Sequence, residues 1–128
     1  MKVVLDTNFI IYCLKKKIDI EEELKKLNED PYLEIIILSS ILEELERFSK
    51  DKEKKLIERN LAKVFLEMIK ERKINVNIVS SNQKNPDEAI KVFCSKNPDV
   101  LLASYDKELK KKIKNNFLVI KGNRIFLA

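Results

Sequence analysis

Short apolar runs alternate with longer amphipathic stretches along the chain, and this alternation predicts the secondary structure. The short runs are rich in Val, Ile and Leu and have the length of buried strands. They occupy residues 2–5, 33–39, 74–80, 99–104 and 117–121, and a sixth, shorter run at 124–128 fits an edge piece. Strands that alternate with helices predict an α/β fold, here a three-layer sandwich around a mostly parallel sheet.

The stretches between these runs repeat their apolar residues at helical spacing. The predicted helices cover residues 9–16, 20–29, 41–50, a long segment that begins at Asp51, 86–96 and 107–116. Pro86 suits the first position of its helix. Polar residues fit the N-terminal caps of the others, namely Thr7 or Asn8, Asp19, Ser39 or Ser40, Asp51 and Asp106.

Length and composition favour a single domain that covers residues 1–128. A chain of 128 residues can bury about two thirds of the surface that its unfolded form exposes, so one core suffices. No apolar run approaches the roughly 20 residues that span a membrane. Charges at Lys2 and Asp6 leave no signal-peptide core. We therefore expect a cytoplasmic protein without membrane contact.

The content of titratable residues excludes some chemistry and leaves other chemistry open. The chain has no histidine, and its two cysteines, Cys13 and Cys94, form no CxxC pair. A zinc site and His-based acid–base catalysis are therefore not expected, and both cysteines are expected to be reduced and buried. The formal net charge of +5 comes mostly from Lys. This excess fits a polyanionic partner such as RNA, and equally a solvated Lys-rich surface.

Two aspartates stand where predicted parallel strands end. Asp6 follows the first apolar run, and Asp106 follows the fourth in the segment LLASYD. Sites in open parallel sheets form beyond the carboxyl ends of the strands, where the winding direction reverses. If the first and fourth strands are neighbours, the two aspartates face each other at that point. A cap role explains Asp6 poorly, because Thr7 or Asn8 would serve.

Glu44 and Asp87 extend this acidic set, because each lies near the start of a predicted helix. Two carboxylates 4 Å apart repel by roughly 4 kcal/mol at an effective dielectric of about 20, so either some are protonated or cations lie among them. Oxygen ligands favour Mg²⁺ or Mn²⁺, which can activate water for phosphoryl displacement. Ser104 precedes Asp106 by two positions and is a candidate to hydrogen-bond a metal-bound water. Plainer interpretations remain: a helix cap for Asp106, first-turn acidity for Glu44 and Asp87, and a strand end for Ser104.

At these residues the sequence resembles the PIN-domain nuclease family. The opening VVLDTNFII is similar to that family's first strand and leading aspartate, and SSILEELERF to its second motif, in which Glu44 rather than Glu43 matches. PDEAI resembles the third motif, and LLASYDKELKKKI the fourth, in which a Thr or Ser precedes the aspartate by two. The four motifs, in this order, span almost the whole chain. Tyr105 stands where that family commonly has a small or polar residue.

The resemblance implies a five-stranded sheet in the order 3-2-1-4-5 and Mg²⁺- or Mn²⁺-dependent cleavage of RNA. Asp6, Glu44, Asp87 and Asp106 map onto the family's metal-binding acids, and Ser104 onto its accompanying hydroxyl. The Lys-rich run after Asp106 looks more similar to the ribosomal-RNA maturation branch than to the toxin branch. A homodimer, and an antitoxin or ribosome-assembly partner, are consistent with these branches.

Two alternatives stay open. The chain could be a catalytically inactive module with the PIN fold that binds RNA or protein, if the acids lie too far apart to hold a metal. The apolar segment FIIYCL could form a dimer face or pack on the sheet, and packing is the favoured interpretation.

Overall fold

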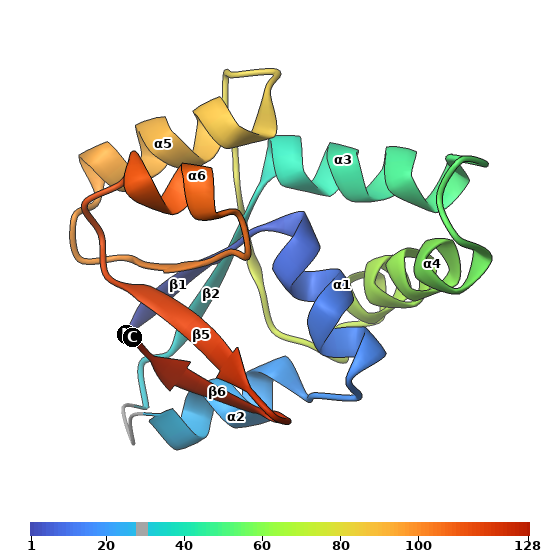
Figure 1. The fold of residues 1–128 in the computed structure, drawn as a ribbon, viewed down its shortest axis with the longest axis horizontal. Coiled ribbons are helices and arrows are strands. Elements are labelled where there is room, and N and C mark those ends of the chain that lie inside the picture. Colours follow the sequence, from blue (N-terminus) through green and yellow to red (C-terminus); the bar gives the residue numbers. More distant parts are fainter. Residues whose placement is uncertain (28–30) are drawn as a thin grey trace.

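A six-stranded sheet in the order β3-β2-β1-β4-β5-β6 runs through the centre of the protein (Figure 1). The computed structural model describes residues 1–27 and 31–128. The strands are β1 (Lys2–Leu5), β2 (Glu34–Leu38), β3 (Asn77–Val79), β4 (Leu101–Ala103), β5 (Phe117–Lys121) and β6 (Arg124–Leu127). The first five are parallel, which confirms the predicted α/β fold and the order 3-2-1-4-5. The short sixth strand pairs antiparallel with β5 at the edge.

The helices cover both faces of this sheet. They are α1 (Thr7–Lys15), α2 (Ile20–Leu27), α3 (Ser39–Lys50), α4 (Leu56–Lys70), α5 (Pro86–Lys96) and α6 (Lys107–Lys111). The strand order turns back after β3, so right-handed crossovers place α1 to α4 on one face and α5 and α6 on the other. Contacts of α1 with both α3 and α4 agree with this arrangement. The result is the predicted three-layer sandwich.

The first and fourth strands are neighbours, as the site argument requires. Leu5 is in register with Ala103, and the Asp6 amide continues the ladder by donating to the Ala103 carbonyl at 2.9 Å. The ends of β1 and β4 are thereby tied to each other. The residues that follow these two strands consequently start from the same edge of the sheet.

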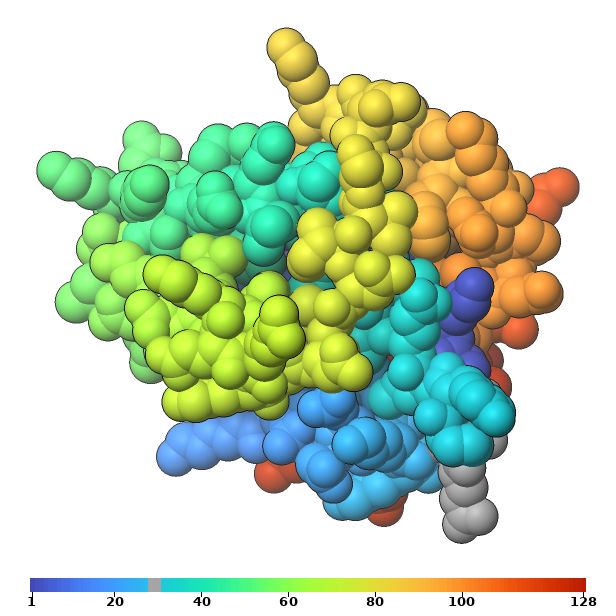
Figure 2. Space-filling view, turned by 180° about the vertical axis from the view of Figure 1, so that it is seen from behind, coloured from blue at the N-terminus to red at the C-terminus, as the bar shows by residue number. Residues whose placement is uncertain are grey.

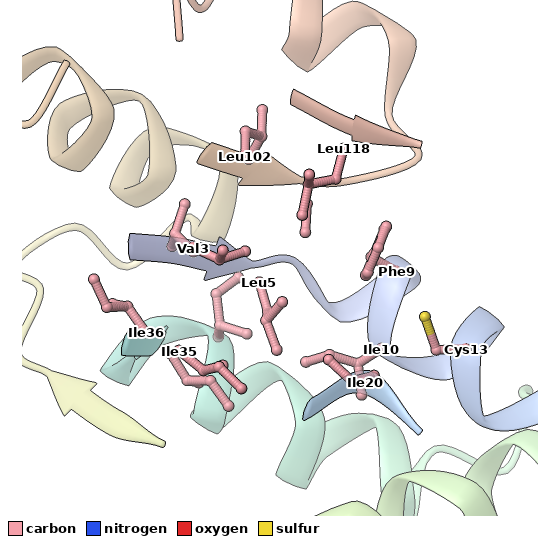
Figure 3. Close-up of a cluster of buried hydrophobic side chains, with 14 of the residues drawn as sticks. Val3, Leu5, Phe9, Ile10, Cys13, Ile20, Ile35, Ile36, Leu102 and Leu118 are labelled. Carbon is pink, nitrogen blue, oxygen red and sulfur yellow. The ribbon is translucent and has the colours of Figure 1, made fainter. Parts of the chain in front are cut away.

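The core consists of the apolar residues of the strands and of the helix faces that cover them. Val3, Val4 and Leu5 have no exposed surface, which explains why β1 has no polar alternation. Figure 3 shows side chains from β1, β2, β4, β5, α1 and α2 meeting in this layer. In the FIIYCL segment, Phe9, Ile10, Ile11 and Cys13 are buried. Packing in the core is therefore the role of this segment's apolar side chains.

The other side of the molecule carries β3 and the segment after it. Figure 2 shows this segment running along the surface between α4 and β2 toward α5. Three serines anchor it: the Ser81 amide donates to Ser39 Oγ at 2.9 Å, and Ser81 Oγ accepts from the Ser40 amide at 3.1 Å. The start of the loop that leads into α5 is thus fixed to the N-terminus of α3.

Two predicted helices differ from the observed ones by five residues at one end. Asp51 does not begin a helix, because it ends α3 and makes a turn instead: its side chain accepts from the Glu53 amide and its carbonyl from the Lys54 amide, each at 3.0 Å. The long helix begins at Leu56. The last helix ends at Lys111 rather than 116. Residues 112–116 do not continue the helix, because Asn115 Nδ2 donates to the carbonyls of Asn97 and Val100 at 2.9 and 2.7 Å and holds this segment against the turn before β4.

The remaining differences are small. β3 covers only three residues of the predicted seven, since it is an edge strand paired with β2 alone. The helix that Asp19 caps is described to Leu27, and its predicted end at residues 28–29 lies outside the described residues. Both cysteines are buried and free, as expected. Across the described ranges, no helix has the length and apolar character needed to cross a membrane.

Candidate active site

Four elements deliver the predicted site residues to the carboxyl edge of the sheet. Asp6 lies between β1 and α1, and Asp106 between β4 and α6. Glu44 lies in the second turn of α3, and Asp87 is the second residue of α5. Helices α1, α3 and α6 begin shortly after the carboxyl ends of β1, β2 and β4, and α5 is reached by the loop that leaves the carboxyl end of β3. The topology therefore gathers residues that are up to 100 positions apart.

Asp6 is the most enclosed of these acids, with 4% of its surface exposed. Its Oδ1 accepts from the Thr7 amide at 2.8 Å, and its Oδ2 accepts from Ser104 Oγ at 2.7 Å. The sequence argument assigned the cap of α1 to Thr7 or Asn8, and this was wrong: Asp6 itself is the N-cap. The reason is that extended backbone at Asp6 aims its carboxylate back at the first helical amide.

The environment of Asp6 favours its protonated form. Burial raises the pKa of its carboxyl from 3.8 to about 6, against the hydrogen bonds from Ser104 and Thr7, which lower it. The negative charges of Glu44 and Asp87 add to the increase. These two acids therefore lie within electrostatic reach of Asp6.

Asp106 combines a cap role with a place beside Asp6. Its Oδ1 accepts from the amides of Glu108 and Leu109 at 3.0 and 3.1 Å, so the plain cap interpretation is correct as far as it goes. Its own amide donates to Ser104 Oγ at 3.0 Å. Because the same hydroxyl donates to Asp6, Ser104 bridges the two aspartate positions.

Asp87 stands further out, with an exposed side chain on the first turn of α5. Partial loss of solvent around its carboxylate raises its pKa, and the Asp106 charge adds to this. Lys91 and Lys112 act in the opposite direction. Asn85 caps the helix by accepting from the Asp87 and Glu88 amides. The Asp87 side chain is therefore not needed for the cap and stands near Asp106.

The sequence profile of the PIN-like domain family matches residues 3–122 of this chain. The chain belongs to the PIN-like domain family. Ribonuclease VapC4 of Methanocaldococcus jannaschii is 37% identical over 128 residues, which are 98% of this chain and 94% of that protein. The solved structure of the PIN domain endonuclease Utp24 superposes with a TM-score of 0.79 at 24% identity, covering 99% of this chain and 90% of that one. At 24% identity, the likeness to the Utp24 structure shows a shared fold and no more.

The donor set of this PIN-like site suits a hard divalent cation. Its side chains offer only oxygen, and each Asp6 oxygen accepts one hydrogen bond and keeps a second lone pair. Among residues 1–27 and 31–128, no group of three or more Asp, Glu, His or Cys lies close enough to hold an ion. Mg²⁺ is commonly bound by one or two carboxylates and several waters, so a pair of these acids fits it.

A groove of about 780 Å³ opens between α1, α3 and α4 and includes one of the four acids, Glu44, in its wall. Asn8 and Glu44 are part of its wall, together with the aromatic residues Tyr12 and Phe48. Its charges balance: Lys15, Arg47 and Lys54 against Glu44, Asp51 and Glu58. The sequence argument singled out none of Tyr12, Arg47 and Phe48. The signal for Tyr12 was a hydroxyl-bearing ring within the otherwise apolar run FIIYCL.

Tyr105 and Asn8 connect this groove to the acids. The Asn8 Oδ1 accepts from the Tyr105 amide at 3.2 Å, so Asn8 organises the turn after β4. The Tyr105 ring packs on Tyr12, with centroids 4.4 Å apart and planes inclined by 45°, and on Phe9 at 6.0 Å. The residue remains 36% exposed. Tyr105 therefore packs on Tyr12, which lines the groove, and also keeps part of its surface open to solvent.

Proposed function

We propose that this chain is an endoribonuclease that cleaves RNA phosphodiester bonds at the acidic edge of its sheet with the help of Mg²⁺ or Mn²⁺. The observation that carries the proposal is the electrostatic coupling of Asp6 to Glu44 and Asp87, and of Asp87 to Asp106. Asp6 and Asp106 cap helices, but capping does not require the carboxylates of Glu44 and Asp87 to lie within electrostatic reach of Asp6. Acids gathered in this way around a buried aspartate suit a cation. The ribonuclease name of the VapC4 relative supports RNA as the substrate.

The proposed roles follow from the positions of the side chains. Asp6 and Asp106, bridged by Ser104, would be direct ligands, and Glu44 and Asp87 would complete the shell or orient the attacking water. A bound Mg²⁺ or Mn²⁺ would supply the Lewis acidity that activates water and stabilises the phosphate oxygens. Ser104 holds the Asp6 carboxylate in place and favours its charged form. In this proposal the buried Asp6 carboxylate lowers the stability of the metal-free protein and becomes favourable when a cation binds.

A second candidate function is a PIN-fold module that binds RNA or protein without cleavage. It is favoured by the spread of the acids, since no metal-holding group of three occurs among the described residues. The proposal of a nuclease requires only that two acids and water molecules hold the cation. The two functions therefore differ in metal binding, which can be measured directly.

The decisive experiment is cleavage of a labelled, partly single-stranded RNA in Mn²⁺, Mg²⁺ and EDTA. Wild type is expected to cut in either metal and not in EDTA, and Asp6→Asn is expected to be inactive while still folded. Asp99→Asn is the matched control, because Asp99 is exposed and lies outside the acidic set. If wild type neither cuts nor binds Mn²⁺ more tightly than Asp6→Asn, the binding module is the better function.

The biological role and the partners are also proposals. The resemblance to PIN nucleases suggests two roles. The first is a ribosomal-RNA maturation enzyme with a ribosome-assembly factor as partner, and the second is a toxin with an antitoxin as partner. A homodimer is proposed in either case. Induced expression separates the roles, because a toxin arrests growth through the activity that Asp6→Asn removes. Sedimentation of the purified chain tests the dimer.

A further inference from the structure

A second hollow, of about 350 Å³, lies between α5 and the segment after α6. Its polar wall consists of Lys91, Lys112 and Lys114 together with Ser95 and Asn115. We call it the lysine hollow. Within residues 1–27 and 31–128, no Asp or Glu lines it, in contrast to the larger groove, where three cations face three acids. The lysine hollow is therefore a place of net positive charge.

The lysine hollow adjoins the candidate active site through two of its three cations. Lys91 follows Asp87 by four positions on α5, and residues at this spacing share one face of a helix. Lys112 ends α6, the helix that Asp106 begins. The positive charges of both ammonium groups lower the pKa of the Asp87 carboxyl. Figure 1 shows α5 and α6 next to each other at the same end of the molecule.

Hydrogen bonds fix the backbone around the lysine hollow. Asn115 is 9% exposed and donates to the carbonyls of Asn97 and Val100. These bonds tie the segment after α6 to the turn between α5 and β4. Lys112 and Lys114 belong to this anchored segment, and they remain exposed. Lys112 and Lys114 thus stand on an anchored stretch of backbone and are exposed, so a ligand can reach them.

Compact ammonium charges recognise phosphate groups and carry no base specificity. The Ser95 hydroxyl and the Asn115 amide already donate to backbone carbonyls, so the three ammonium groups are the donors that this hollow offers. Lys91 already pairs with Glu88 at 2.9 Å, but this pair is at the surface and an exposed pair of this kind contributes little. A phosphate can therefore replace Glu88 as its partner. The larger groove is electrically balanced and lined by aromatic rings, which suits bases. The lysine hollow is positively charged, which suits phosphates.

We propose that the lysine hollow binds backbone phosphates of the single-stranded RNA next to the bond that is cut, and so fixes the side on which the strand leaves the four acids. This inference rests on the proposed ribonuclease function for its substrate. It adds a binding site that the acids do not include. The strand then runs from the balanced, aromatic groove across the acids to the lysine hollow.

The test compares two triple variants with equal loss of charge. The first, Lys91→Gln/Lys112→Gln/Lys114→Gln, empties the lysine hollow of cations. The second replaces Lys25, Lys63 and Lys70 by Gln, which are exposed on α2 and α4. Binding of a short fluorescein-labelled single-stranded RNA is measured by anisotropy in EDTA, where cleavage does not occur, over a range of NaCl concentrations. Circular dichroism verifies that both variants are folded.

For the lysine-hollow variant we expect an affinity lower by about tenfold or more, and a slope of log K against log[NaCl] that is smaller by roughly 2, since each phosphate contact on a single strand contributes about 0.7. In Mn²⁺ its KM for RNA cleavage should rise while kcat changes little, because uniform binding is lost. The control variant should keep the wild-type slope. Equal effects in both variants, or an RNA affinity and salt slope unchanged in the lysine-hollow variant, would overturn the proposal.

These outcomes separate the two proposals. RNA binding through the lysine hollow with no cleavage in any metal supports the hollow and contradicts the nuclease. Cleavage by wild type, with both triple variants binding and cutting alike, supports the nuclease and overturns the hollow.

Discussion

Ser104 Oγ donates to Asp6 Oδ2 at 2.7 Å, across 98 positions of sequence. The same oxygen accepts from the Asp106 amide at 3.0 Å. One hydroxyl thus connects the end of β1 with the start of α6, and it does so inside the buried part of the acidic edge. This bond opposes the effect of burial on Asp6, because it favours the charged carboxylate.

Ser104→Ala should therefore raise the pKa of Asp6 above its value of about 6. The loss of a buried hydrogen bond to a charged group should also lower the free energy of unfolding at neutral pH by about 1.5–3 kcal/mol. Denaturant unfolding measures the second effect, and an NMR titration of the Asp6 carboxyl carbon the first. Ser95→Ala is the control, because the Ser95 hydroxyl donates to a backbone carbonyl, not to a carboxylate, and is exposed. An unchanged Asp6 pKa would show that the bond has no electrostatic role.

Asp6→Asn should stabilise the metal-free protein. Folding raises the pKa of Asp6 from 3.8 to about 6, so the folded state binds more protons than the unfolded state between these pH values. Stability therefore falls as the pH rises from about 4 to about 6, and the deficit persists at neutral pH. The difference between the two pKa values corresponds to roughly 3 kcal/mol, an upper bound for the gain in the variant.

The measurement is urea unfolding in EDTA at several pH values. Wild type should lose stability across the stated pH range, and Asp6→Asn should lose less. The variant should at the same time lose Mn²⁺ binding, so stability and function move in opposite directions. A variant less stable than wild type at neutral pH would mean that the amide cannot take over the bonds of the carboxylate.

Glu44→Gln and Glu43→Gln test which of two adjacent acids belongs to the site. Glu44 is half-buried and faces the groove, whereas Glu43 is exposed. Glu44→Gln should weaken Mn²⁺ binding by about tenfold or more. It should also lower the pKa of Asp6, because the Glu44 charge raises it. Glu43→Gln should resemble wild type in both, and the reverse result, read by calorimetric Mn²⁺ titration, would move the assignment to Glu43.

Ser81→Ala should loosen the loop that leads to Asp87. Ser81 Oγ takes part in bonds with the Ser40 amide, Ser40 Oγ and Ser39 Oγ, at 3.0 to 3.1 Å. Their loss should cost about 1–3 kcal/mol of stability. Hydrogen exchange of the amides from 81 to 88 should become faster, and RNA cleavage slower. Ser80→Ala, an exposed neighbour, should change neither.

Much of this fold could be predicted from local sequence. The apolar runs of β1 and β5 and the Pro86 start of α5 were predicted to the residue, because a buried strand and a proline at a helix start leave strong local signals. Asp51 and the end of α6 were not. In each case a polar side chain has two possible uses, a cap or a turn, and the choice depends on partners such as the Asn97 carbonyl, 18 positions from Asn115.

The sequence by itself determined which residue types stand at the strand ends: acids at positions 6 and 106, a hydroxyl at 104, and no histidine. Alternation of strands and helices then required those ends to share one edge of the sheet. Only the tertiary structure decided that Ser104 bridges Asp6 to Asp106 and that three lysines line one hollow. These relationships depend on the closeness of β1 and β4 and of α5 and the segment after α6, and such closeness arises only when the layers pack.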